Sequence, residues 1–194
     1  MPARHIGAIV LLSAGLLTAA LPAAPSSAAS AKAKAYGVWA QGALSAGPLP
    51  RADSAFGPTT NKQGPWVLGQ AHAQILSAEE FQVTAREGMA TAQVKGIRAL
   101  GRTVQVADLH ASCTTTGTGI KTEVRIGNNH FGNHAVSQGV VPGPTRITFD
   151  GGSAVINEQQ LNTATRALTV NALHITTPQR GDFILGSVTC SPPP

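Results

Sequence analysis

The run TVQVADLHASC at residues 103–113 carries the strongest structural constraint in the sequence. Apolar and polar residues alternate along it, which predicts a strand with one buried face. The alternation slips by one step in the middle, and one extra residue in a strand is a β-bulge, which restores the apolar side chains to the core and bends the sheet. The apolar positions on the two sides of the slip are Val104 and Val106, then Leu109, Ala111 and Cys113.

A second run, LTVNALHI at residues 168–175, has the same slip, because Leu168 and Val170 are followed by Leu173 and Ile175. Short alternating runs continue along the chain between turn residues, and no stretch after the N-terminal region has helical apolar spacing. We therefore predict an all-β domain, a β-sandwich of jelly-roll-like or related topology with about nine to ten strands.

The predicted strands lie at residues 35–44, 65–71, 89–100, 103–116, 119–127, 134–141, 145–150, 153–160, 167–177 and 182–190. The Asp150-Gly151-Gly152 stretch predicts a tight hairpin. The segment 45–64 has three prolines and little periodicity, which is typical of a long loop. Residues 76–88 fit either a helical turn or a strand.

The first residues have the layout of a secretory signal peptide, with Arg4 and His5, an apolar run, and then small residues. We predict a signal peptide at 1–29, a disordered leader remnant at 30–34, one domain at 35–190 and a disordered tail at 191–194. No second apolar run is long enough to cross a bilayer, so we expect an exported protein with no membrane span after signal cleavage.

Composition limits the classes of partner. Only 12% of the residues are charged and 4% are aromatic, and the formal net charge is +5. The basic residues are scattered, whereas nucleic-acid binding calls for a clustered patch or a known module. We therefore expect no nucleic-acid partner, and charge supports only a weak attraction to anionic cell-wall polymers.

Two cysteines, Cys113 and Cys190, are present in a chain that we expect to be exported, where thiols become oxidised. Cys113 is in phase with Leu109 and Ala111, and Cys190 is in phase with Ile184 and Val188, so both side chains should point inward. The pattern predicts one disulfide in the core, with two unpaired buried thiols as the alternative.

The second half of the chain resembles the secreted bacterial proteins of the choice-of-anchor P family. The resemblance covers residues 35–190 and rests on AYGV (35–38), ASCTTTGTG (111–119), AVINEQ (154–159) and LTVNALHI (168–175). It implies an exported all-β domain associated with the cell surface, and it implies no catalytic residues. This chain departs from the family name because no sorting motif or apolar helix follows Cys190.

Catalytic motifs are weak. Glu158 is the one acid inside a family-like motif, and a hydrogen bond from the strand end to a neighbouring turn explains it without catalysis. His110 and His174 fall on the strand face opposite their apolar neighbours, as exposed or hydrogen-bonded histidines do. No GxSxG elbow, phosphate loop or cofactor fingerprint occurs, so we expect no cofactor.

His130 and His134 stand four residues apart in IGNNHFGNH, residues 126–134. The glycines and asparagines around them disfavour a helix, and on a strand the two imidazoles would be about 13 Å apart, too far to share one ion. A zinc site would also need a third ligand, which nothing nearby indicates. These histidines are weak metal candidates, and the segment is better explained as a hairpin connection.

Together these features favour a non-enzymatic, exported β domain with a structural or interaction role at the cell envelope or in the extracellular space. Its partners would be a cell-wall polymer, a glycan or another surface protein. One alternative is a carbohydrate-binding module, in which aromatic side chains stack on sugars. The candidate stacking residues of such a module are Tyr36, Trp39, Trp66 and Phe131. A weaker alternative is a secreted glycan hydrolase that uses Glu158.

Overall fold

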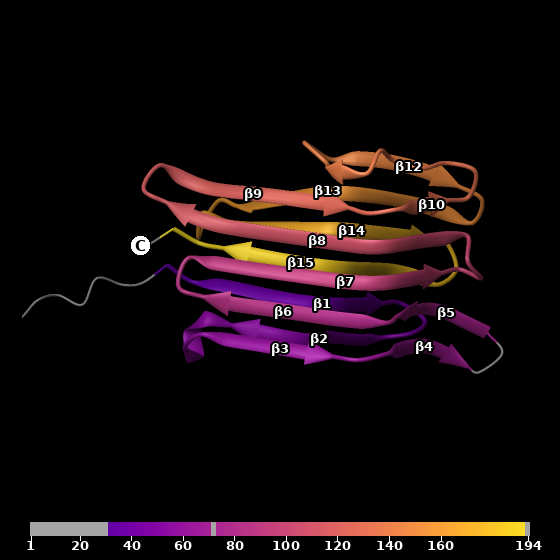
Figure 1. Cartoon of the computed structure of the whole chain (residues 1–194), viewed down its shortest axis with the longest axis horizontal. Coiled ribbons are helices and arrows are strands. Elements are labelled where there is room, and N and C mark those ends of the chain that lie inside the picture. Colours follow the sequence, from indigo (N-terminus) through magenta and orange to yellow (C-terminus); the bar gives the residue numbers. More distant parts are fainter. Residues whose placement is uncertain (1–30, 71–72, 193–194) are drawn as a thin grey trace, which may run out of the picture.

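The computed structural model describes residues 31–70 and 73–192 and shows an all-β protein built from two packed antiparallel sheets (Figure 1). The described residues form fifteen strands, more than the sequence predicts, and one 3-10 helix (Ser54–Phe56). The two-layer arrangement confirms the predicted all-β class and agrees with a β-sandwich. The predicted signal peptide at 1–29 lies outside the described residues.

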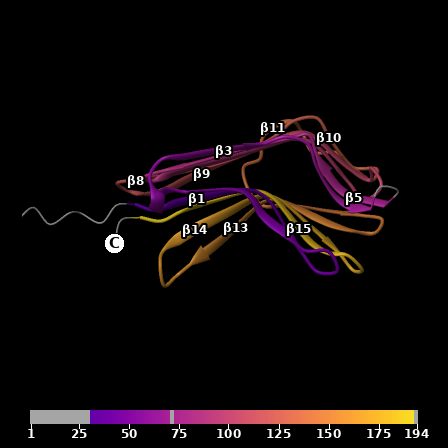
Figure 2. The same cartoon turned by 90° about the horizontal axis from the view of Figure 1, so that it is seen from below.

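The six-stranded sheet has the order β12-β13-β14-β15-β1-β2. Sequence neighbours pair as hairpins in most of it, and β15 returns beside β1, so the two ends of the described chain lie together at one end of the molecule (Figures 1 and 2). Its strands are β1 (Ala33–Gln41), β2 (Ala46–Asp53), β12 (Thr145–Phe149), β13 (Gly152–Asn162), β14 (Ala167–Thr177) and β15 (Gly181–Cys190).

The nine-stranded sheet is built around the long central strands β7 and β8. Beside these two strands, short strands lie end to end in pairs, so that each pair occupies one strand position of the sheet (Figure 1). The pairs are β5 with β6, β4 with β3, and β9 with β10. The strands are β3 (Thr59–Gln63), β4 (Trp66–Gln70), β5 (Ala73–Ala78), β6 (Glu80–Arg86), β7 (Met89–Ala99), β8 (Val104–Thr116), β9 (Gly119–Ile126), β10 (Asn129–Phe131) and β11 (Gly139–Val140).

The core lies between the two sheets and consists of the inward-facing alternate residues of both. Phe81, Phe131 and Phe183 are the largest fully buried side chains. The predicted disulfide joins Cys113 on β8 to Cys190 on β15 and therefore links the two sheets. It lies at the end where β15 finishes, away from the β7–β8 turn.

A line of extra residues crosses the six-stranded sheet. In five neighbouring strands of this sheet, β13, β14, β15, β1 and β2, the pairing skips one residue at the same level. Between β1 and β15, for example, Tyr36 pairs with Ser187 and Val38 pairs with Leu185, so Gly37 and Gly186 are left without a paired residue. Because each strand gains one residue at the same place, the register is kept while the inward and outward faces exchange phase. The skipped residues are Pro50, Gly37, Gly186, Ala172 and Asn157.

The nine-stranded sheet has a matching irregularity. β7 and β8 skip Gly96 and Ala107 between the pairs Lys95–Asp108 and Ile97–Val106, and β9 ends before Asn128 at the same level. Both sheets bend in the same direction near their middle (Figure 2). The slips predicted in residues 103–113 and 168–175 are thus confirmed, and they belong to two sheet-wide features.

Several local predictions were wrong. The segment 45–64, expected as a loop, contains β2, the 3-10 helix and β3. Its prolines are tolerated because Pro48 and Pro50 lie on β2, an edge strand that has a free side. β1 begins at Ala33, inside the expected leader remnant. Residues 76–88, for which a helical turn and a strand were both left open, form strands and belong to β5 and β6. In the expected strand 134–141, only β11 forms.

The predicted phase of β15 was also wrong. Ile184 pairs with Trp39 and His174, whereas Val188 and Cys190 face the core. The cause is Gly186, the extra residue of this strand, which has a φ of +65°. No helix among residues 31–70 and 73–192 is long and apolar enough to cross a bilayer.

Candidate functional site

The outer face of the six-stranded sheet is the candidate functional site, because the bend makes this face concave. Figure 2 shows the sheet containing β1, β13, β14 and β15 bent near its middle in the same direction as the other sheet, so its outer face lies on the inner side of the bend. The line of extra residues forms the crease. Two cross-strand rows of side chains lie beside it, one on each side.

The first row is a line of polar side chains across four strands, three of which are joined by side-chain hydrogen bonds. Glu158, Asn171, Ser187 and Tyr36 occupy successive paired positions on β13, β14, β15 and β1. Asn171 Nδ2 donates to Glu158 Oε2 at 2.7 Å, and Ser187 Oγ donates to Asn171 Oδ1 at 2.8 Å. Tyr36 is paired with Ser187 on the neighbouring strand and continues the row. Arg51 on β2 pairs with Tyr36 and extends the row to the sheet edge.

The second row lies across the crease and runs through Trp39 on β1, Ile184 on β15 and His174 on β14. His174 connects the rows, because its Nδ1 lies 3.0 Å from Glu158 Oε2. Its Nε2 lies 3.5 Å from Asp182 Oδ1 on the other side. The imidazole therefore stands between two carboxylates.

Burial confirms that the crease is tight. Ser187 is 0% exposed and Asn171 is 2% exposed although both point away from the core. Buried amides and hydroxyls need partners, and within the described residues every buried side-chain polar atom has one. Burial raises the pKa of the Tyr36 phenol; the hydrogen bond with Ser187 lowers it in part, and the charge of Glu158 raises it further.

Trp39 supplies the accessible apolar surface of this face. Its side chain is 38% exposed, beside the buried Ile184 and the half-buried His174. Tyr36, three residues earlier on the same strand, is half-buried on the same face. Of the four aromatic candidates named from the sequence, these two are brought together.

The other two aromatic candidates lie elsewhere. Phe131 is fully buried in the core, and Trp66 on β4 packs edge-to-face against Phe81, with ring centroids 6.1 Å apart. Phe131 therefore has no ring surface open to a sugar, and the partly buried Trp66 lies on the nine-stranded sheet, away from the concave face. The sequence contained no signal for this division, because it depends on which strand faces which layer.

The segment with His130 and His134 is only partly a turn. β10 lies end to end with β9, and both strands pair with β8; in β10, His130 is paired with Gln105. The chain then reverses between Phe131 and His134. Both histidines are exposed and line one hollow of about 420 Å³ with Asp150. Among residues 31–70 and 73–192, no three His, Cys, Asp or Glu side chains are grouped to hold a metal ion.

His110 lies on the convex side of the molecule, in register with Gln93 and Arg125. Burial lowers the pKa of its imidazole, while the nearby Asp108 and Glu123 carboxylates oppose that change. It has no contact with the crease.

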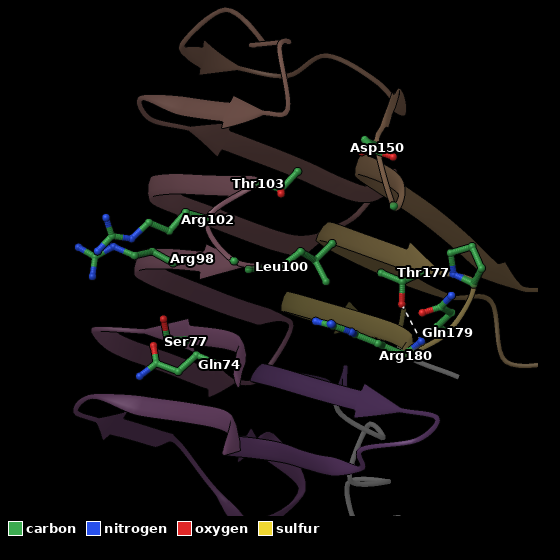
Figure 3. A pocket seen from close by; sticks show the side chains of 14 residues that line it. Gln74, Ser77, Arg98, Leu100, Arg102, Thr103, Asp150, Thr177, Gln179 and Arg180 are labelled. Carbon is green, nitrogen blue, oxygen red and sulfur yellow. Dashed lines mark hydrogen bonds between the residues drawn. The ribbon is translucent and has the colours of Figure 1, made fainter. Parts of the chain in front are cut away.

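A cleft opens at the end of the molecule opposite the disulfide (Figure 3). It has a volume of about 730 Å³ and lies between the β7–β8 turn on one sheet and the β12–β13 and β14–β15 turns on the other. Leu100 and Arg180 point into it from opposite sides (Figure 3). Its other walls are mostly polar, from residues such as Gln74, Thr177 and Gln179.

No protein-family model, curated protein or solved structure matches this chain. The resemblance to the choice-of-anchor P family therefore stays a prediction.

Proposed function

We propose that this protein is an exported, non-enzymatic interaction domain that binds an extended glycan of the cell envelope on the concave face of its six-stranded sheet. The observation that carries the proposal is the crease, where Tyr36 and Trp39 lie beside the polar chain Glu158–Asn171–Ser187. Membership of the choice-of-anchor P family, with its surface association, belongs to the same proposal.

The chemistry of this face suits a sugar. A pyranose ring has apolar C–H patches, which pack on an aromatic face, and hydroxyl groups, which need fixed donors and acceptors. Trp39 supplies the aromatic surface, while Glu158, His174 and Asp182 supply polar atoms at the rim of the crease. Hydrogen bonds within the row hold these groups in place before the ligand arrives, which lowers the entropy cost of binding.

A binding role suits Glu158 better than a catalytic one. The same carboxylate oxygen that accepts from Asn171 also lies within hydrogen-bond distance of His174. A carboxylate held in this way is a fixed acceptor, whereas glycosidic hydrolysis needs two carboxyl groups that face each other across the scissile bond.

The test measures binding of the purified, exported protein to insoluble peptidoglycan, chitin, cellulose and β-glucan. The same measurement is then made with the variant Trp39→Ala. We expect retention on at least one polymer and about a tenfold loss of affinity in Trp39→Ala. Phe56→Ala is the matched control, because Phe56 is 86% exposed and lies on the 3-10 helix outside the concave face.

Two results would count against the proposal. If Trp39→Ala and Phe56→Ala weaken retention equally, the concave face does not bind the polymer. If soluble sugars are released from any polymer and the release stops in Glu158→Gln, the protein is a hydrolase.

A further inference from the structure

We infer that the end cleft is a second binding site, which takes an organic anion: a carboxylate or phosphate attached to a small apolar group. This site is independent of the concave face. The concave face lies on the outer side of one sheet, whereas the cleft lies between the turns of both sheets.

Arg180 is the group that would contact the charge. It stands in the β14–β15 turn, and its side chain extends into the cleft toward Leu100 (Figure 3). Within the described residues its guanidinium has no ion-pair or hydrogen-bond partner; the one hydrogen bond of this residue runs from its backbone N to Thr177 Oγ1 at 3.1 Å. A guanidinium has five N–H donors and binds planar anions bidentately.

The turn that carries Arg180 is well fixed. Thr177 Oγ1 accepts from the Arg180 backbone and donates to Gly181 O at 3.1 Å, so it closes the turn from both sides. Thr177 itself is buried. The fixed turn holds the backbone of Arg180 at the wall of the cleft.

The rest of the charge around the cleft also favours an anion. Arg98 and Arg102 line the cleft with their stems and point away from Leu100 (Figure 3), and Arg98 is paired with Glu79 at 3.1 Å. Asp150 is the one carboxylate among the lining residues, and it is exposed in the β12–β13 turn. Because Glu79 neutralises Arg98, Arg102 and Arg180 against one aspartate leave a net positive charge around the cleft, which attracts anions.

Leu100 defines the apolar part of the ligand. Its side chain points into the cleft opposite Arg180 and is half-buried against the core. A volume of about 730 Å³ falls in the range of small-molecule sites. A ligand that places a ring or short alkyl group on Leu100 would place its acidic group on Arg180.

The experiment titrates the full exported chain with three probes and measures their binding by the NMR shifts of backbone amides. Benzoate and phenyl phosphate carry the charge and the apolar ring, and benzamide is the neutral counterpart of benzoate. We expect both anions to shift the amides of the cleft turns, with benzamide at least about tenfold weaker.

Variants then assign the contact. Arg180→Gln should weaken benzoate about tenfold, whereas Arg166→Gln, which makes the same charge change in the β13–β14 turn at the other end of the sheet, should leave it unchanged. The inference is overturned if benzoate and benzamide bind equally, if the two arginine variants behave alike, or if no anion shifts the cleft amides. Failure of glycan binding would leave these outcomes unaffected.

Discussion

Glu158 Oε2 lies 3.0 Å from His174 Nδ1 and 2.7 Å from Asn171 Nδ2, so one carboxylate oxygen joins the two rows of side chains across the crease. We expect Glu158→Ala to lower the free energy of unfolding by about 1–3 kcal/mol, because the buried Asn171 amide loses its acceptor. Urea unfolding followed by tryptophan fluorescence measures this change. Gln160→Ala, at an exposed position on the same strand, is the control. Equal stability of the two variants would show that the network adds nothing.

Tyr36 is the one tyrosine of the chain, so its ionisation can be followed alone by ultraviolet absorbance. Because burial raises its pKa, the absorbance should change above the usual value of about 10. The two neighbours act in opposite directions: Glu158→Gln should lower the pKa of Tyr36, and Ser187→Ala should raise it. Shifts of the same sign in both variants would contradict the arrangement of the row.

The same pKa has a consequence for stability. Since the folded-state pKa of Tyr36 is raised, the protonated phenol stabilises the fold fully below the unfolded-state pKa of about 10, and this contribution is lost as the pH rises through the folded value. Tyr36→Phe should remove that pH dependence. Thermal unfolding between pH 8 and pH 11 compares the two proteins.

Gly37 is the extra residue of β1 at the crease, and it faces Phe81 on the other sheet. A Cβ atom added there would lie 2.5 Å from Phe81 Cδ1 and 2.9 Å from Pro50 Cδ. Gly37→Ala should therefore destabilise the protein by about 1–3 kcal/mol through overpacking. Gly64→Ala is the matched control, because nothing lies within 4 Å of its added Cβ. A stable Gly37→Ala protein would show that the sheets can separate without cost.

The disulfide closes a long loop, because Cys113 and Cys190 have a sequence separation of 77. Replacing both cysteines by serine should lower the free energy of unfolding by about 4 kcal/mol in the chain-entropy model. Guanidinium unfolding of the oxidised protein and the double variant gives the difference. A loss below about 1 kcal/mol would mean that the reduced, unfolded chain is already constrained.

Asp53 ends β2 and caps the 3-10 helix, where its Oδ1 accepts from the Ala55 backbone N at 3.0 Å. Burial alone would raise the pKa of this carboxyl, but the hydrogen bonds from Ala55, Arg51 and Lys34 outweigh burial and lower it. A lowered folded-state pKa gives stability that is present above about pH 4 and is lost as the pH falls through the folded value.

Asp53→Asn should accordingly be less stable than the parent at neutral pH, and the difference should shrink in acid. Glu87→Gln, in the exposed β6–β7 turn, is the control for loss of one negative charge. A constant difference between Asp53→Asn and the parent across the acid range would contradict the lowered pKa.

Much of the strand layout could be predicted because alternation within one strand is a local property. The slips at residues 103–113 and 168–175 were visible, and Cys113 could be placed in the core by phase alone. The slip in β15 was missed because Gly186 and Ser187 carry little apolar signal, and this moved Ile184 to the wrong face. The strands of 45–64 were missed because prolines predict a loop, although an edge strand tolerates them.

The candidate site could not be predicted in the same way. Glu158, Asn171, Ser187 and Tyr36 lie on four strands, and only the strand order and register bring them into one row. Glu158 was expected to bond to a turn, whereas its partners are side chains of the neighbouring strand. Asn171 and Ser187 had no local signal except their position next to the slips.

The five skipped residues of the six-stranded sheet depend on one another. Deleting Ala172 or Asn157 alone would put every later side chain of that strand on the wrong face, so the bend can be removed without such a mismatch only by deleting all five residues together. Descendants whose sequences have drifted beyond recognition should still carry five single-residue offsets in step. That pattern gives a way to recognise them when residue identity no longer does.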